Sequence, residues 1–101
     1  MEARVAASDR KLEEFLREQI KPSLGGADYT ADIRGAWQVV EYMIRRYHCE
    51  LKLDVFLGIT GQHWMASFYS PSQCRRYEAS GPSAPLAICR AAQEAILNLP
   101  G

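Results

Sequence analysis

The sequence predicts an α+β fold in the order α-α-β-β-β-α, a helix-sheet-helix sandwich around a three-stranded antiparallel meander. Two observations carry this prediction. Apolar residues recur at helical spacing in three segments, and at the strand spacing of two between the second and third of them. Turn residues separate the segments. At 101 residues the chain is expected to form a single α/β domain, 1–101, because such a length builds one core.

The first helix is predicted at about 8–21. Its apolar face consists of Leu12, Phe15, Leu16 and Ile20. Ser8 or Asp9 can cap its first N–H groups. Pro22 and Gly25 with Gly26 are expected to end it, because proline cannot continue the hydrogen-bond ladder.

Two further helices are predicted on either side of the strands. The second follows Thr30 as its N-cap and ends with Arg45 and Arg46 in its last turn, where cations complement the helix dipole. Its apolar stripe consists of Ile33, Ala36, Trp37, Val40, Met43, Ile44 and Tyr47. The last helix, 84–99, has Ser83 as its cap and Pro85 in its first turn. Its buried face consists of Ile88, Cys89, Ala92, Ile96 and Leu99.

Three strands are predicted at 49–57, 63–69 and 74–79. In the first, apolar and charged residues alternate, and Gly58 and Gly61 bracket the hairpin to the second. Most apolar residues of the first strand share a face, but Phe56 lies on the other, so we expect helices on both sides of the sheet. The unpaired edge of the third strand favours a homo-oligomer.

The composition argues against several classes of function. Twelve basic and twelve acidic residues give no net charge, which disfavours binding to double-stranded DNA. No apolar run reaches the length of a membrane span, and the first residues do not resemble a secretory signal, so we expect a cytoplasmic protein. The odd number of cysteines, three, favours buried reduced thiols, with no metal site and no cofactor.

The segment 30–41, a strand hairpin and the segment 84–92 together resemble the phage ABA sandwich domain. Their sequences are Thr-Ala-Asp-Ile-Arg-Gly-Ala-Trp-Gln-Val-Val-Glu and Ala-Pro-Leu-Ala-Ile-Cys-Arg-Ala-Ala. The family-like core spans about 29–99. The resemblance implies a small phage or prophage protein with helices flanking an antiparallel sheet. It implies no catalytic residues.

One group of side chains suggests a binding site for a nucleotide-derived molecule. Arginine binds phosphates through two N–H groups, aromatic rings stack on bases, and a serine-glycine loop before a helix offers N–H groups to an anion. The candidate ligand-binding residues are Trp64, Tyr69, Arg75, Arg76, Tyr77, Ser80, Ser83 and Arg90. The alternative is that Trp64 and Phe68 belong to the core, Arg75 and Arg76 solvate an exposed strand, and Ser83 only caps its helix.

A catalytic role is not expected. Cys74, His63 and Asp54 are a nucleophile, a base and an acid that adjacent strands could bring together, but no local motif supports such a triad. We therefore expect a non-enzymatic phage protein that counters host antiviral defence by binding. It would sequester a nucleotide-derived immune signal or, alternatively, inhibit a host defence protein in the manner of an anti-CRISPR protein.

Overall fold

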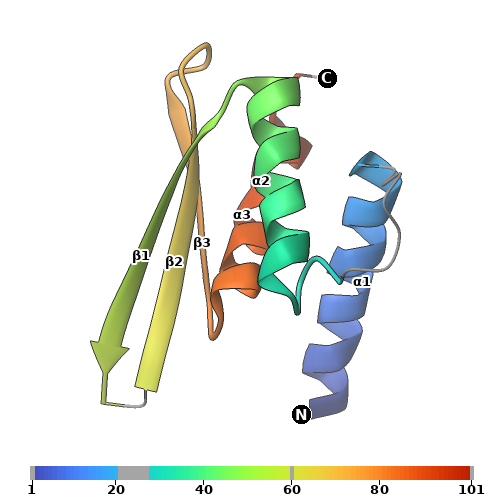
Figure 1. Cartoon of the computed structure of the whole chain (residues 1–101), viewed down its shortest axis with the longest axis vertical. Helices are drawn as coiled ribbons and strands as arrows, with labels where there is room; N and C mark the ends of the chain where they lie inside the picture. Colours follow the sequence, from blue (N-terminus) through green and yellow to red (C-terminus); the bar gives the residue numbers. More distant parts are fainter. Residues whose placement is uncertain (1, 21–27, 60, 101) are drawn as a thin grey trace.

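The computed structural model describes residues 2–20, 28–59 and 61–100, which form an α+β fold (Figure 1). Its elements are α1 (Glu2–Ile20), α2 (Ile33–Tyr47), β1 (Glu50–Gly58), β2 (Gly61–Ser70), β3 (Arg75–Gly81) and α3 (Ala84–Asn98). The predicted class and element order are confirmed. The predicted end of the first helix, at 22–26, lies outside the described residues.

Two helices begin at residues other than those predicted. α1 already starts at Glu2, because the alanine-rich residues before Ser8 favour a helix as strongly as those after it. At α2 the N-cap is Asp32 and not Thr30: Asp32 has an extended backbone, and its carboxylate accepts a hydrogen bond of 2.8 Å from the N–H of Arg34.

α3 lies at the centre of the core. Ser83 caps it as predicted, accepting a hydrogen bond of 3.3 Å from the N–H of Leu86. The small residues Ala91, Ala92 and Ala95 are fully buried, so neighbouring elements approach α3 closely on more than one side. α3 packs on β2 and β3, and α2 packs beside it.

All three helices lie on one side of the sheet. α2 and α3 form the layer next to the strands, and α1 packs behind them, away from the sheet (Figure 1). The expectation of helices on both faces is therefore corrected. Its basis was Phe56, which the structure leaves 52% exposed on a face that otherwise carries Glu50, Lys52 and Asp54 on the same strand.

The strand register fixes which residues face the helices. Leu51 pairs with Phe68, and Phe68 with Tyr77, so these side chains lie on the helix side with the core. Alternate residues point the other way. We call this second side of the sheet the open face. It consists of Glu50, Lys52, Asp54 and Phe56 on β1, His63, Met65, Ser67 and Tyr69 on β2, and Arg76, Glu78 and Ser80 on β3.

One carboxylate connects α1 to the chain before α2. Glu13, whose side chain is only 14% exposed, accepts hydrogen bonds from the N–H of Tyr29 at 3.0 Å and from the N–H and hydroxyl of Thr30 at 2.9 and 3.1 Å. Arg17 forms an ion pair with Glu13 at 3.1 Å and another with Asp28 at 3.2 Å. These contacts hold α1 against the turn at 28–32.

Candidate functional site

The sheet divides the predicted ligand-binding residues between its two faces. Trp64, Arg75 and Tyr77 have the register of the helix side, whereas Tyr69, Arg76 and Ser80 have the register of the open face. Side chains of neighbouring residues in a strand point to opposite faces, so the consecutive residues 75–77 cannot all contact one ligand. Any single site must therefore use only part of the predicted group.

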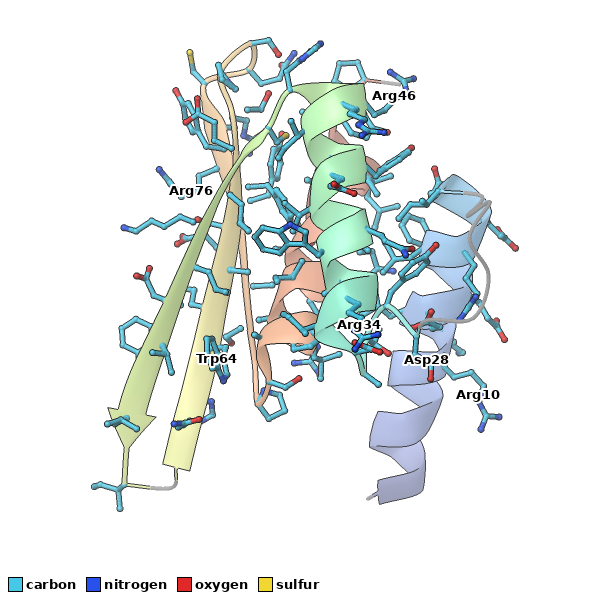
Figure 2. The ribbon with its side chains drawn as sticks, viewed as in Figure 1. Arg10, Asp28, Arg34, Arg46, Trp64 and Arg76 are labelled. Atoms are coloured by element: carbon cyan, nitrogen blue, oxygen red, sulfur yellow. The ribbon has the colours of Figure 1, made fainter. Side chains whose placement is uncertain are left out.

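Arg76 and Tyr69 are brought together on the open face. The guanidinium of Arg76 lies 5.5 Å from the centre of the Tyr69 ring, and its Nη1 donates a hydrogen bond of 2.9 Å to the hydroxyl of Ser67. Figure 2 shows Arg76 on the side of the sheet away from the helices. A cation over an aromatic ring contributes about 0.5–1 kcal/mol at an exposed site, and the contact orients the guanidinium.

The helix-side members of the group have structural environments. Tyr77 is 6% exposed and belongs to the core, and Trp64 is half-buried against it. Arg75 is exposed, with its guanidinium 5.9 Å from the Tyr77 ring centre. Because Tyr77 is buried, its ring offers no free face for stacking on a base.

The loop between β3 and α3 is occupied by contacts within the chain. The hydroxyl of Ser83 caps α3, and Nη1 of Arg90 donates a hydrogen bond of 2.9 Å to the carbonyl of Ser80. Arg90 therefore ties α3 to the end of β3. For Ser83 this arrangement matches the structural alternative, in which it only caps the helix.

The residues of the candidate triad lie at opposite ends of the sheet. His63 is near the start of β2 and pairs with Phe56 of β1, and Asp54 is two residues from Phe56 on the same strand. Cys74 lies beyond the other end of the sheet. It immediately precedes Arg75, which pairs with Ser70, the last residue of β2, and its backbone φ is 53°. Strands rise about 3.3 Å per residue, so the seven steps from His63 to Ser70 put the thiol roughly 20 Å away.

The other two cysteines are not placed to act as nucleophiles. Cys49 and Cys89 are buried, and Cys89 donates a hydrogen bond of 3.1 Å from its Sγ to the carbonyl of Tyr29. Burial raises the pKa of the Cys89 thiol far above its ordinary value, so the unreactive thiol form persists. Within the described part of the chain, no group of three or more His, Cys, Asp or Glu side chains is arranged to hold a metal ion.

The sequence interpretation missed the open face as a continuous surface. It carries three carboxylates and two cations: Glu50, Asp54, Glu78, Lys52 and Arg76. Half-buried Met65 and Tyr69 lie among them. The alternation of apolar and charged residues in β1 could have predicted this surface, because every charged residue of β1 lies on the open face.

An apolar rim adjoins the open face at the β1–β2 end of the sheet. Its members are Phe56 on the open face, Val55 and Leu57 on the helix side of the same strand, and Ile59 in the turn, and they are between 49% and fully exposed. Exposed large apolar side chains that are neighbours at one end of a sheet indicate an interaction site more often than single ones do. Mixed charges, an aromatic ring, a methionine and an apolar rim together resemble the composition of protein interfaces.

Comparisons with known proteins bear on the family. The family model described as the phage ABA sandwich domain matches residues 9–93, which include residues 9–20 of α1 and so extend beyond the segments that carry the resemblance. No curated protein and no solved structure matches the chain. Among the described helices, none is long and apolar enough to cross a membrane.

Proposed function

The chain belongs to the phage ABA sandwich domain family, and we propose that this small phage protein, without being an enzyme, counters host defence by binding a host defence protein through the open face. The observation that carries the proposal is that all helices pack on one side of the sheet, which leaves the other side available. With three carboxylates and two cations, this surface suits a partner of mixed charge better than a polyanion.

A charge reversal on the open face tests this proposal. Glu78 is exposed on β3, and Glu94 is exposed on α3, so Glu78→Lys and Glu94→Lys make the same change on and off the surface. We expect the wild type and Glu94→Lys to co-purify the same defence protein from host cytoplasm and to restore phage plating on defended cells. Glu78→Lys is expected to lose both activities. Equal binding by the two variants would refute the open face as the interface.

A nucleotide-derived immune signal is the second candidate, and the pairing of Arg76 with Tyr69 favours it. The ring offers a stacking surface, and the guanidinium has N–H groups for a phosphate. A ligand at 100 times its Kd would stabilise the protein by about 2.7 kcal/mol, which a thermal shift screen of cyclic and ADP-ribose nucleotides detects.

The adjacent arginine provides a matched control for this second candidate. Arg76→Ala is expected to abolish a nucleotide-induced shift, whereas Arg75→Ala, on the other face of the same strand, is expected to leave it unchanged. A shift lost equally in both variants, or retained in both, would argue against a site at Tyr69. No shift with any nucleotide, together with capture of a host protein, would leave protein binding as the function.

A further inference from the structure

Among the described strands, β1 is at an edge of the sheet, and its outer side pairs with no other described strand. The sheet order is β1-β2-β3, and β1 pairs with β2 through all nine residues, Glu50 to Gly58, without a break in register. Edge strands that avoid pairing with another chain are usually short, bulged or interrupted by proline. β1 is long, regular and without proline, but it carries Glu50, Lys52 and Asp54, and charges also protect an edge, so a partner strand must bring complementary charges.

An apolar flank of α2 adjoins the same part of the molecule. Ile33, Trp37 and Ile44 are each about half exposed and follow one another at helical spacing along one flank. Gly35 is on the opposite side of the helix, against the backbone of Asp28. α3 covers β2 and β3, whereas α2 meets β1 only sparsely, so the helix side of β1 keeps Val55 49% exposed.

The charges of β1 distinguish between the ways in which two copies could pair. When two copies of a strand pair antiparallel about a twofold axis, the residue at the axis lies opposite the same residue of the other copy. A residue one position before it lies opposite the residue one position after it in the other copy. An axis through Lys52 sets two lysines opposite each other, and an axis through Asp54 sets two aspartates opposite each other. An axis through Leu53 sets Lys52 opposite Asp54 on both sides of the axis.

We propose that a second copy of this chain binds the free edge of β1, antiparallel and about an axis through Leu53, to form a six-stranded sheet. Two Lys52–Asp54 pairs then lie on the open face, and Leu51 lies opposite Val55 on the helix side. Opposite charges directly across strands stabilise a pair, whereas like charges destabilise it. Within one chain Lys52 and Asp54 already lie 3.9 Å apart, so the dimer forms an alternating array of four charges.

The twofold axis also sets the two α2 flanks on the same side of the extended sheet. Each flank then faces the axis with Ile33, Trp37 and Ile44, which are exposed in the single chain. Burying such side chains supplies the apolar free energy that strand pairing alone lacks. This inference extends beyond the proposed function, because it concerns the backbone edge of β1 and the α2 flank and shares with the open face only the charges of β1.

Reciprocal charge substitutions test the dimer and its register. Light scattering after size exclusion is expected to give twice the mass of one chain for the wild type. Lys52→Asp and Asp54→Lys each create like-charged pairs and are expected to raise the dimer Kd at least tenfold. The double variant, with both substitutions, restores opposite charges and is expected to return to near the wild-type Kd. Glu78→Lys, on β3, serves as the control that leaves dimerisation unchanged.

Disulfide formation provides a second test of the register. With Cys74→Ser to remove the exposed native thiol, chains carrying Lys52→Cys are mixed with chains carrying Asp54→Cys. Residues directly opposite in antiparallel strands have Cα atoms about 4.5–5.5 Å apart, within disulfide range. Mixed chains are expected to cross-link at least tenfold faster than either alone. A monomeric wild type at 100 µM, no rescue by the double variant, or preferred cross-linking of Lys52→Cys with itself would each overturn the proposal.

Discussion

Gly35→Ala is expected to destabilise the protein, although alanine is normally the better helix residue. In an open helix the change from glycine to alanine stabilises by about 1 kcal/mol. At Gly35 an added Cβ would lie 2.5 Å from the carbonyl oxygen of Asp28 and 2.8 Å from its carbonyl carbon. Both are backbone atoms, and the same oxygen accepts a hydrogen bond of 3.0 Å from the N–H of Asp32, so the turn cannot yield without loss.

The change in the free energy of unfolding caused by Gly35→Ala is the sum of two opposing contributions. Overpacking in a fixed site costs about 1–3 kcal/mol, and a contact this short against backbone belongs at the upper end. After the gain in helix propensity, the expected loss in the free energy of unfolding is about 2 kcal/mol. Urea denaturation followed by circular dichroism measures it, and for a chain of this size the Tm falls by roughly 8–16 °C.

Gly58→Ala is the matched control for this prediction. Its added Cβ would meet the carbonyl oxygen of Gly61 at 3.6 Å, an ordinary van der Waals distance. We expect a change within about 0.5 kcal/mol there, as for surface substitutions in general. If Gly35→Ala were as stable as the wild type or more stable, the turn at 28–32 would not press on α2 as the structure has it.

Four further predictions concern α1, the core and the thiols. Glu13→Ala should lower the free energy of unfolding by about 2–4 kcal/mol in urea titrations, since it leaves two N–H groups and a hydroxyl without their acceptor, whereas exposed Glu14→Ala should change it by under about 0.5 kcal/mol. Tyr29→Phe should be neutral or stabilising by up to about 1 kcal/mol, because the buried hydroxyl has no hydrogen-bond partner among the described residues; a larger loss would reveal a partner. A thiol reagent should titrate one cysteine per folded chain, Cys74, and all three after denaturation; two fast thiols would contradict the burial. Because burial raises the pKa of Cys89, the unfolded chain loses that proton first, and stability should fall as the pH rises above about 8.5 in denaturation curves.

Local patterns predicted the elements well where the residues that define an element are adjacent in sequence. The start of α3 is an example, because Ser83 and the apolar spacing behind it act within one turn. The start of α2 was wrong because Thr30 is engaged by Glu13, 17 residues earlier. A contact over that separation leaves no local pattern, and with Thr30 occupied the cap passes to Asp32.

The layer arrangement and the site needed the tertiary structure for different reasons. The position of α1 depends on its contacts with α2 and α3, and one apolar residue, Phe56, was a poor indicator of cover on a face of charged neighbours. The division of the predicted site was readable from alternation, since Arg75 and Arg76 are consecutive in a strand. The sequence interpretation grouped these residues because they are adjacent in sequence, and it therefore missed that they lie on two faces.

Host-protein binding through the open face and dimerisation through the edge of β1 are proposed for different parts of the same sheet, so substitutions can separate the two. Dimerisation through β1 would join two open faces into one six-stranded surface, with Glu78 of each copy on an outermost strand, β3, far from the dimer axis. Lys52→Asp should weaken dimerisation, and adding Asp54→Lys should restore the dimer; because both residues also lie on the open face, the mass of the dimer and not host-protein binding is the readout for the edge. Glu78→Lys should weaken host-protein binding while the mass of the dimer stays unchanged. If both substitutions affected both readouts equally, the edge and the face would form one interface.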